Sequence, residues 1–282
     1  RIALYCSAPC PMFTLRRNIH PMDPPVQTAP VLVVFDFDWS LINENSDTWI
    51  FERLCPELAR EVKELSSTSF QGRWTALMDH LVGRLMAEPH SATIDAINDA
   101  LCSIPVFTET LEALKLARAA GAEVCILSDA NHHYIATILR HHGLQSLVAA
   151  VVTNKAALCP PSDAACSACT HSSPLPRLHI SPHQPEEEPH GYPLCPCNLC
   201  KGMVLDEWRQ QTSYAKIVYV GDGGGDYCPV VRLGEQDTVL CRKDWALHRH
   251  IQEGRAGALT RARVVPWATG ADILAEFCSI FS

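Results

Sequence analysis

Residues 31–40 read VLVVFDFDWS, a run of five apolar residues followed by two aspartates that stand two positions apart. A continuous apolar run rich in valine is typical of a strand whose two faces are both covered, as in a parallel sheet. Open α/β sheets bind their ligands beyond the carboxyl ends of the strands, where Asp36 and Asp38 stand. One of these carboxylates is then placed to attack a substrate while the other transfers a proton. The alternative, two solvated acids that open a loop, is disfavoured by three further patterns.

A serine and a lysine follow along the chain. EVCILSDAN (residues 123–131) is a second apolar strand, and Ser128 near its end is suited to a hydrogen bond with a phosphoryl oxygen. Its alternative role is to cap the helix that follows. Lys201 begins the helical pattern KGMVLDEW (residues 201–208), although a lone lysine is ordinarily a solvated surface residue.

An acidic, glycine-rich turn ends the next apolar strand, KIVYVGDGGGD (residues 216–226). Glycines allow the backbone to approach a ligand closely. Asp222 and Asp226 supply hard oxygen ligands of the kind that Mg2+ prefers. Each pattern is weak evidence alone, but the four in this order, each after a strand or at the start of a helix, form a consistent set.

Together these motifs resemble those of the haloacid dehalogenase superfamily. Asp38 indicates its phosphatase branch, since the dehalogenases lack the second acid. The chain is most similar to the phosphoethanolamine/phosphocholine phosphatase family, which includes plant phosphatases assigned to thiamine monophosphate and an animal branch assigned to pyridoxal phosphate. The resemblance extends from about residue 31 to the C-terminus and is carried by FDFD (35–38), ENSD (44–47), LSDAN (127–131), CPCNLCKG (195–202) and GDGGGDYCP (221–229).

The resemblance implies a catalytic role for four of these residues. Asp36 attacks phosphorus and forms an aspartyl-phosphate, which divides one difficult displacement into two easier ones. Asp38 protonates the leaving oxygen and then activates the water that hydrolyses the intermediate. Ser128 and Lys201 bind the phosphoryl oxygens, because phosphoryl transfer depends mainly on positioning and on neutralisation of charge.

The resemblance also implies Mg2+ as the cofactor, held by the Asp36 carboxylate, the backbone carbonyl of Asp38 and Asp222. Asp226 is expected beside the metal, either bound directly or through water. The chain carries 31 acidic and 23 basic residues, a net charge of −8, which repels an anionic substrate. Positive charge must therefore come from the metal and from Lys201. The same charge balance argues against nucleic acid as a partner.

Two further carboxylates bear on the substrate, which we expect to be a small phosphate monoester. Positions matching Asp47 and Asp129 face the substrate amine in the phosphocholine-type relatives, and a carboxylate attracts an ammonium group. Alternatively, Asp47 complements a helix dipole and Asp129 caps a helix. The substrate expected from the resemblance is phosphoethanolamine or phosphocholine, with thiamine monophosphate, pyridoxal phosphate and pyrophosphate as alternatives.

The alternation of strands and helices predicts an α/β fold, a Rossmann-like three-layer parallel sheet core with a small helical cap inserted after the first strand. The core is expected to comprise residues 31–47 and 106–282, and the cap residues 48–105, where the strand signal gives way to helical spacing. A cap there would exclude water from the active site and select the leaving group. Residues 1–30 lack periodicity and are predicted to be a disordered leader.

Residues 157–195 interrupt this alternation with an insertion rich in proline, cysteine and histidine. Five cysteines there or just beyond have ligand types suited to structural Zn2+: Cys166, Cys169, Cys195, Cys197 and Cys200. A flexible loop with incidental thiols is the favoured interpretation. A zinc-binding interaction module on an inactive phosphatase fold is the alternative class of function, and the intact catalytic motifs disfavour it.

The cysteine content bears on the cellular compartment of the protein. The 14 cysteines include strand positions such as Cys125 and Cys241, which suits buried free thiols in a reducing compartment and predicts a cytoplasmic protein. No run approaches the roughly 18 apolar residues of a membrane span, so the membrane is not expected as a partner.

Overall fold

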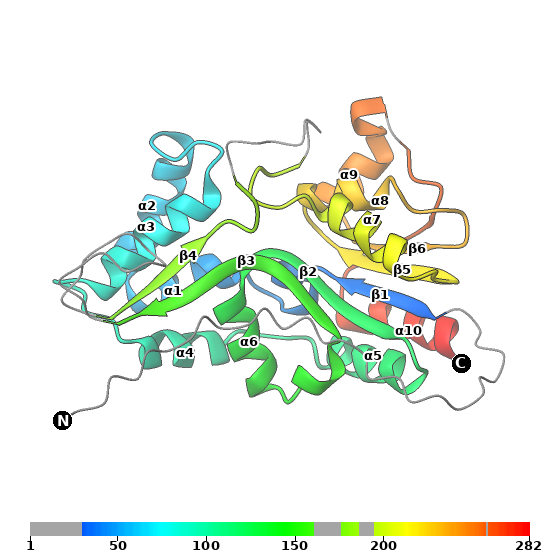
Figure 1. Ribbon diagram of the computed structural model, residues 1–282, viewed down its shortest axis with the longest axis horizontal. Coiled ribbons are helices and arrows are strands. Elements are labelled where there is room, and N and C mark those ends of the chain that lie inside the picture. Colours follow the sequence, from blue (N-terminus) through cyan, green and yellow to red (C-terminus); the bar gives the residue numbers. More distant parts are fainter. Residues whose placement is uncertain (1–29, 161–175, 186–194, 258) are drawn as a thin grey trace, which may run out of the picture.

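The computed structural model describes residues 30–160, 176–185, 195–257 and 259–282, which build a seven-stranded sheet in the order β4-β3-β2-β1-β5-β6-β7 (Figure 1). The strands are β1 (Val31–Phe35), β2 (Glu123–Asn131), β3 (Ala150–Cys159), β4 (Arg177–Ser181), β5 (Lys216–Gly221), β6 (Thr238–Arg242) and β7 (Arg263–Trp267). Every neighbouring pair is parallel except β3 and β4. The predicted Rossmann-like α/β core is confirmed, with one antiparallel strand at its edge.

The central strand β1 explains why its sequence is apolar without interruption. Val33 and Phe35 pack into the hydrophobic core on one face of the sheet, and Leu32 and Val34 pack into the core on the other. All four side chains are inaccessible to solvent. Because β1 pairs with both β2 and β5, the carboxyl ends of these three strands meet at one edge of the sheet.

Helices cover the two faces of the sheet and complete three layers (Figure 1). One face carries α5 (Thr108–Ala119), α6 (His132–His141) and α10 (Gly270–Phe281), and the other carries α7 (Lys201–Gln211), α8 (Tyr227–Val230) and α9 (Ala246–Glu253). The helix α9 ends at Gly254, whose φ of 59° is in the left-handed region that glycine adopts without steric cost. None of the helices in the described ranges is long and apolar enough to cross a membrane.

Four helices lie between β1 and α5 in the sequence: α1 (Ser46–Leu54), α2 (Pro56–Ser67), α3 (Trp74–Met86) and α4 (Ile94–Cys102). Asn45 and Thr93 accept hydrogen bonds from the first turns of α1 and α4, and a proline begins α2, where its missing N–H costs nothing. These helices occupy the segment in which the sequence predicts a cap.

An aspartate of α3 anchors the edge strand β4. The Asp79 carboxylate accepts hydrogen bonds from Arg177 (2.7 Å), from the Ile180 N–H (2.8 Å) and from His179 if Nδ1 carries the proton (2.9 Å). The interpretation of residues 157–195 as a loop is therefore wrong for residues 157–159, which belong to β3, and for Arg177–Ser181, which form β4. Leu178 and Ile180 of β4 are buried, and Asp79 accepts hydrogen bonds from the Arg177 side chain and the Ile180 N–H. Residues 161–175 and 186–194 of that insertion, and residues 1–29 of the expected leader, lie outside the described residues.

Candidate active site

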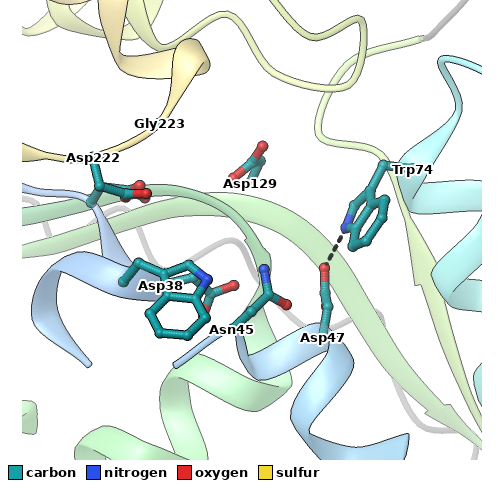
Figure 2. A pocket seen from close by; sticks show the side chains of 9 residues that line it. Asp38, Asn45, Asp47, Trp74, Asp129, Asp222 and Gly223 are labelled. Atoms are coloured by element: carbon teal, nitrogen blue, oxygen red, sulfur yellow. Dashed lines mark hydrogen bonds between the residues drawn. The ribbon is translucent and has the colours of Figure 1, made fainter. Parts of the chain in front are cut away.

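A cavity of about 260 Å³ opens at the carboxyl ends of the central strands. Its lining consists of five aspartates that the sequence predicts as site residues and four residues that it does not: Asp36, Asp38, Asp47, Asp129 and Asp222, with Trp39, Asn45, Trp74 and Gly223. Figure 2 shows Asp222 on one side of this cavity and Asp47 beside Trp74 on the other. The structure thus brings together motifs that are up to 186 residues apart in the sequence, from residue 36 to residue 222.

Asp36 is held where β1 ends. Its N–H donates to the Val220 carbonyl of β5 (2.9 Å), and its Oδ1 accepts from the Phe37 N–H (2.7 Å). The chain then turns sharply, because Trp39 has a φ of 59°, in the left-handed region that non-glycine residues rarely adopt. Two residues beyond Asp36, Asp38 accepts a hydrogen bond from the Ser46 N–H (3.0 Å), which connects the turn to α1.

A buried arginine supports this turn. Arg242, at the end of β6, donates to the Trp39 carbonyl and to Asn43 Oδ1, both at 2.7 Å. Its guanidinium also lies 5.5 Å from the ring centroid of Trp39 and 4.4 Å from that of Trp245. Arg242 was not identified from the sequence, although it lies at the carboxyl end of an apolar strand, as other residues of the site do.

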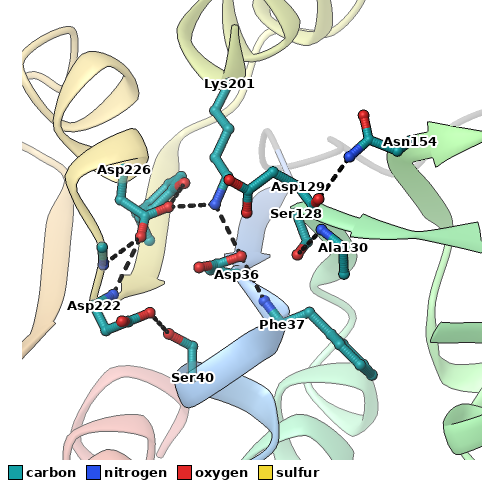
Figure 3. Close-up of polar contacts among 12 residues, drawn as sticks. Asp36, Phe37, Ser40, Ser128, Asp129, Ala130, Asn154, Lys201, Asp222 and Asp226 are labelled. Atoms are coloured by element: carbon teal, nitrogen blue, oxygen red, sulfur yellow. Dashed lines mark hydrogen bonds and ion pairs between the residues drawn. The ribbon is translucent and has the colours of Figure 1, made fainter. Parts of the chain in front are cut away.

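Lys201 is not the solvated surface lysine that a lone lysine would ordinarily be, since only 1% of the residue is exposed. Its Nζ lies 2.8 Å from Asp36 Oδ1 and 2.8 Å from Asp226 Oδ1 (Figure 3). Asp226 also accepts hydrogen bonds from the Tyr219 hydroxyl (2.7 Å) and the Gly223 N–H (2.9 Å). Protein donors therefore engage both carboxylate oxygens of Asp226. The residue is also fully buried and does not line the cavity.

Ser128 and Asp129 stand where β2 meets the site, and neither caps the following helix. That cap is Asn131, whose Oδ1 accepts from the Tyr134 N–H at 3.1 Å. Ser128 is completely buried and its Oγ accepts from the Ala130 N–H (3.2 Å). Asn154 of β3 donates to the Asp129 carbonyl at 2.6 Å, which fixes the backbone there while the carboxylate lines the cavity.

Asp47 lies in the first turn of α1 but points toward the cavity. Its Oδ2 accepts a hydrogen bond from the indole Nε1–H of Trp74 at the start of α3 (2.8 Å; Figure 2). The α3 helix therefore contributes a side chain to the cavity. Trp74 was not identified from the sequence, because a tryptophan at an apolar helical spacing is indistinguishable from a core residue.

The site concentrates buried negative charge. Burial raises the pKa of Asp36 well above its usual range, with a further contribution from Asp226 that Lys201 opposes. Burial likewise raises the pKa of Asp222 to about 7, of Asp38 to about 8 and of Asp47 to about 7. One lysine does not compensate this number of carboxylates, so the site is suited to additional positive charge.

Carboxylate oxygens of Asp36, Asp222 and Asp226 lie within 4.8 Å of one another. This all-oxygen donor set fits Mg2+, which favours hard carboxylate ligands. Asp36 and Asp222 line the cavity, whereas Asp226 is occupied by Lys201, Tyr219 and backbone N–H groups. The fit is therefore better for Asp36 and Asp222 as direct ligands than for Asp226.

The sequence model of a family described as "Putative Phosphatase" matches residues 31–280. A thiamine phosphate phosphatase-like protein of Arabidopsis thaliana is 33% identical over 247 residues, covering 86% of this chain and 91% of the relative. An inorganic pyrophosphatase of the same organism is 31% identical (86% and 81% covered), and a pyridoxal phosphate phosphatase of Mus musculus is 30% identical (87% and 96% covered).

Among solved structures, a substrate-bound phosphoserine phosphatase superposes with a TM-score of 0.55 at 14% identity, covering 89% of this chain and 99% of the other. This likeness concerns the fold alone. The family match covers most of the chain and includes the strands that carry Asp36, Ser128 and Asp222. The chain therefore belongs to this phosphatase family.

Proposed function

We propose that the protein hydrolyses small phosphate monoesters through an aspartyl-phosphate at Asp36, with Mg2+ as cofactor. The observation that carries this proposal is the pairing of Asp36, at the wall of the cavity, with the buried Lys201. Asp36 Oδ attacks phosphorus, and the bond from phosphorus to the ester oxygen breaks. A water then displaces the aspartate from phosphorus and restores the enzyme.

Asp38 is the proposed general acid and base. Burial raises its pKa to about 8, which favours the protonated carboxyl group. It is therefore able to give a proton to the leaving alkoxide and, once ionised, to take one from the hydrolytic water. The hydrogen bond from the Ser46 N–H holds its side chain, which lines the cavity two residues after the nucleophile.

Lys201 and Ser128 are proposed to bind the phosphoryl oxygens. Mg2+ would be held by the carboxylates of Asp36 and Asp222 and by the backbone carbonyl of Asp38, and it would supply positive charge to a phosphoryl group. Asp226, proposed beside the metal, would act mainly by orienting Lys201, since both of its oxygens accept protein hydrogen bonds.

The substrate we propose is the phosphate ester of a cationic alcohol, with phosphoethanolamine and phosphocholine as the amino-alcohol examples. Asp47 and Asp129 support this, because both line the cavity that contains Asp36. Burial raises the pKa of Asp47 to about 7, so a bound cation would favour its ionised form. Thiamine monophosphate also carries a cationic ring, and one relative is named for thiamine phosphate.

Residues 48–105 are proposed to act as the cap over this site. Trp74 supports this role, since it lines the cavity from α3 and binds Asp47, the carboxylate assigned to the leaving group. A cap that supplies the wall next to the leaving group would select substrates by the alcohol rather than by the phosphate.

The test is a phosphate-release assay over phosphoethanolamine, phosphocholine, thiamine monophosphate, pyridoxal phosphate and pyrophosphate, with and without Mg2+. We expect Mg2+-dependent turnover that EDTA abolishes, and the highest kcat/KM for a cationic ester. Asp36→Asn keeps the shape of the nucleophile and should abolish turnover. Retention of a tenth of the parent rate by this variant, or full activity in excess EDTA, would contradict the mechanism. Highest kcat/KM for pyrophosphate would contradict the substrate assignment alone.

A further inference from the structure

Three cysteines from two distant segments meet beside the segments that carry Lys201 and Asp226. Cys195 and Cys200 precede α7, and Cys228 lies in α8, just beyond Asp226. The Sγ atoms are 3.6 Å apart for Cys195 and Cys200 and 3.7 Å apart for Cys200 and Cys228, and all three lie within 4.8 Å of one another. Cys200 and Cys228 are completely buried, while Cys195 is half-buried.

These separations match those of a thiolate metal site. Tetrahedral zinc with Zn–S bonds of about 2.3 Å places neighbouring sulfurs about 3.8 Å apart. A disulfide requires about 2.05 Å and joins only two sulfurs, so it accounts for neither the spacing nor the third thiol. Thiolate sulfur is a ligand type that zinc prefers, and three sulfurs this close together can bind one ion.

The surrounding backbone is built around this cluster. Gly202 is required for the approach of Cys228, because a Cβ at position 202 would lie 2.6 Å from its Sγ. Cys200 also caps α7, since its Sγ accepts from the Met203 N–H at 3.4 Å. Negative charge on this sulfur would be stabilised by the helix N-terminus, which favours the thiolate that a metal requires.

We propose that Cys195, Cys200 and Cys228 bind one Zn2+ as thiolates. Each thiol would release its proton to solvent on binding. The metal would join the start of α7 to α8, and hence the segment of Lys201 to that of Asp226. It is a structural site, separate from the carboxylates proposed to hold Mg2+.

This ligand set differs from the one suggested by the sequence. Cys197 points elsewhere, since its Sγ lies 3.2 Å from the Gly72 carbonyl. Cys166 and Cys169 lie outside the described residues. Cys228 was missed because it stands 28 residues after Cys200, in a different motif.

The test is a Co2+ titration of the full chain, reduced with a phosphine and freed of metal. Co2+ reports sulfur ligation through thiolate-to-metal charge transfer, which carboxylate ligands do not produce. We expect one Co2+ bound with this band, the visible bands of tetrahedral cobalt, and displacement of Co2+ by one Zn2+. Absence of the charge-transfer band, or formation of a Cys195–Cys200 disulfide in place of metal binding, would overturn the proposal.

Substitution of individual cysteines tests which thiols bind the metal. Loss of an outer partner of a metal ligand already weakens binding about 10–100-fold, so Cys228→Ser should weaken Zn2+ affinity by more than about 100-fold. Cys125→Ser, which also removes a buried thiol, and the double variant Cys166→Ser/Cys169→Ser should retain the band. Circular dichroism shows whether each variant folds. If Cys228→Ser does not fold, the full charge-transfer intensity in Cys195→Ser would contradict the assignment as decisively as retention in Cys228→Ser.

Discussion

Lys201 Nζ lies 2.8 Å from Asp36 Oδ1, and the two side chains are 2% and 7% exposed. The same nitrogen lies 2.8 Å from Asp226 Oδ1. Coulombic attraction to both carboxylates raises the pKa of Lys201 well above its ordinary value, although burial opposes this. The lysine therefore remains charged where a phosphoryl group would need a cation, and it also compensates buried negative charge.

These two roles can be separated by substitution. Lys201→Met leaves two buried carboxylates without their cation, and breaking a buried ion pair in this way costs about 3–5 kcal/mol. We expect this loss in the free energy of unfolding, measured by urea denaturation, together with loss of turnover. In the double variant Lys201→Met/Asp226→Asn, one of the two charges is gone, so part of the stability should return while turnover stays absent. Recovery of turnover in the double variant would contradict the phosphate-binding role of Lys201.

Asp47 and Asp129 should determine the preference for a cationic leaving group. Asn at either position should raise KM for phosphoethanolamine, because a hydrogen bond to a charged group contributes about 1.5–3 kcal/mol. This corresponds to about tenfold to a hundredfold. Nitrophenyl phosphate, whose leaving group carries no positive charge, is the matched control, and its KM should change little. Equal losses on both substrates would show that these carboxylates serve the framework of the site.

Stability should depend on pH through Asp47, whose pKa is raised by burial from 3.8 to about 7. Between pH about 4 and about 7 the folded protein keeps a proton that the unfolded chain has lost, so stability falls as the pH rises through this window. Three pKa units correspond to about 4 kcal/mol at most. Asp47→Asn should make the pH dependence of urea denaturation of the metal-free protein shallower between pH 5 and 8 by about one proton, while Asp38 and Asp222 maintain the rest. Asp272→Asn, at an exposed cap where backbone hydrogen bonds lower the pKa, should not.

Arg242 should act through the turn that follows the nucleophile. Arg242→Lys keeps the positive charge but loses the two-pronged contact with the Trp39 carbonyl and Asn43, and lysine stacks less well on Trp245. We expect kcat to fall about tenfold or more, since one such hydrogen bond is equivalent to about 1.5 kcal/mol. KM should change little. A rise in KM at constant kcat would instead assign Arg242 to substrate binding.

From the sequence alone we predicted the strand that precedes Asp36, the order of the motifs and the family resemblance. These are local properties: an unbroken apolar run requires burial on both faces, and β1 has it because hydrophobic cores lie on each side. The helical spacing within residues 48–105 likewise predicted helices in that segment, and α3 is one of them. Each of these patterns lies within a single strand or helix, so it can be recognised without knowing which elements pack beside it.

The contacts between side chains that are distant in the sequence became visible in the folded protein. The pairing of β1 with β5 brought Asp226 to Asp36, and the packing of α7 brought Lys201 to both of them. The placement of α3 brought Trp74 to Asp47. In the same way, β4 is held beside β3 by Asp79, about a hundred residues earlier in the sequence. The Asp79 carboxylate accepts hydrogen bonds from the Arg177 side chain and the Ile180 N–H of β4. Contacts of this kind depend on packing between elements, and no spacing within a single stretch of sequence encodes them.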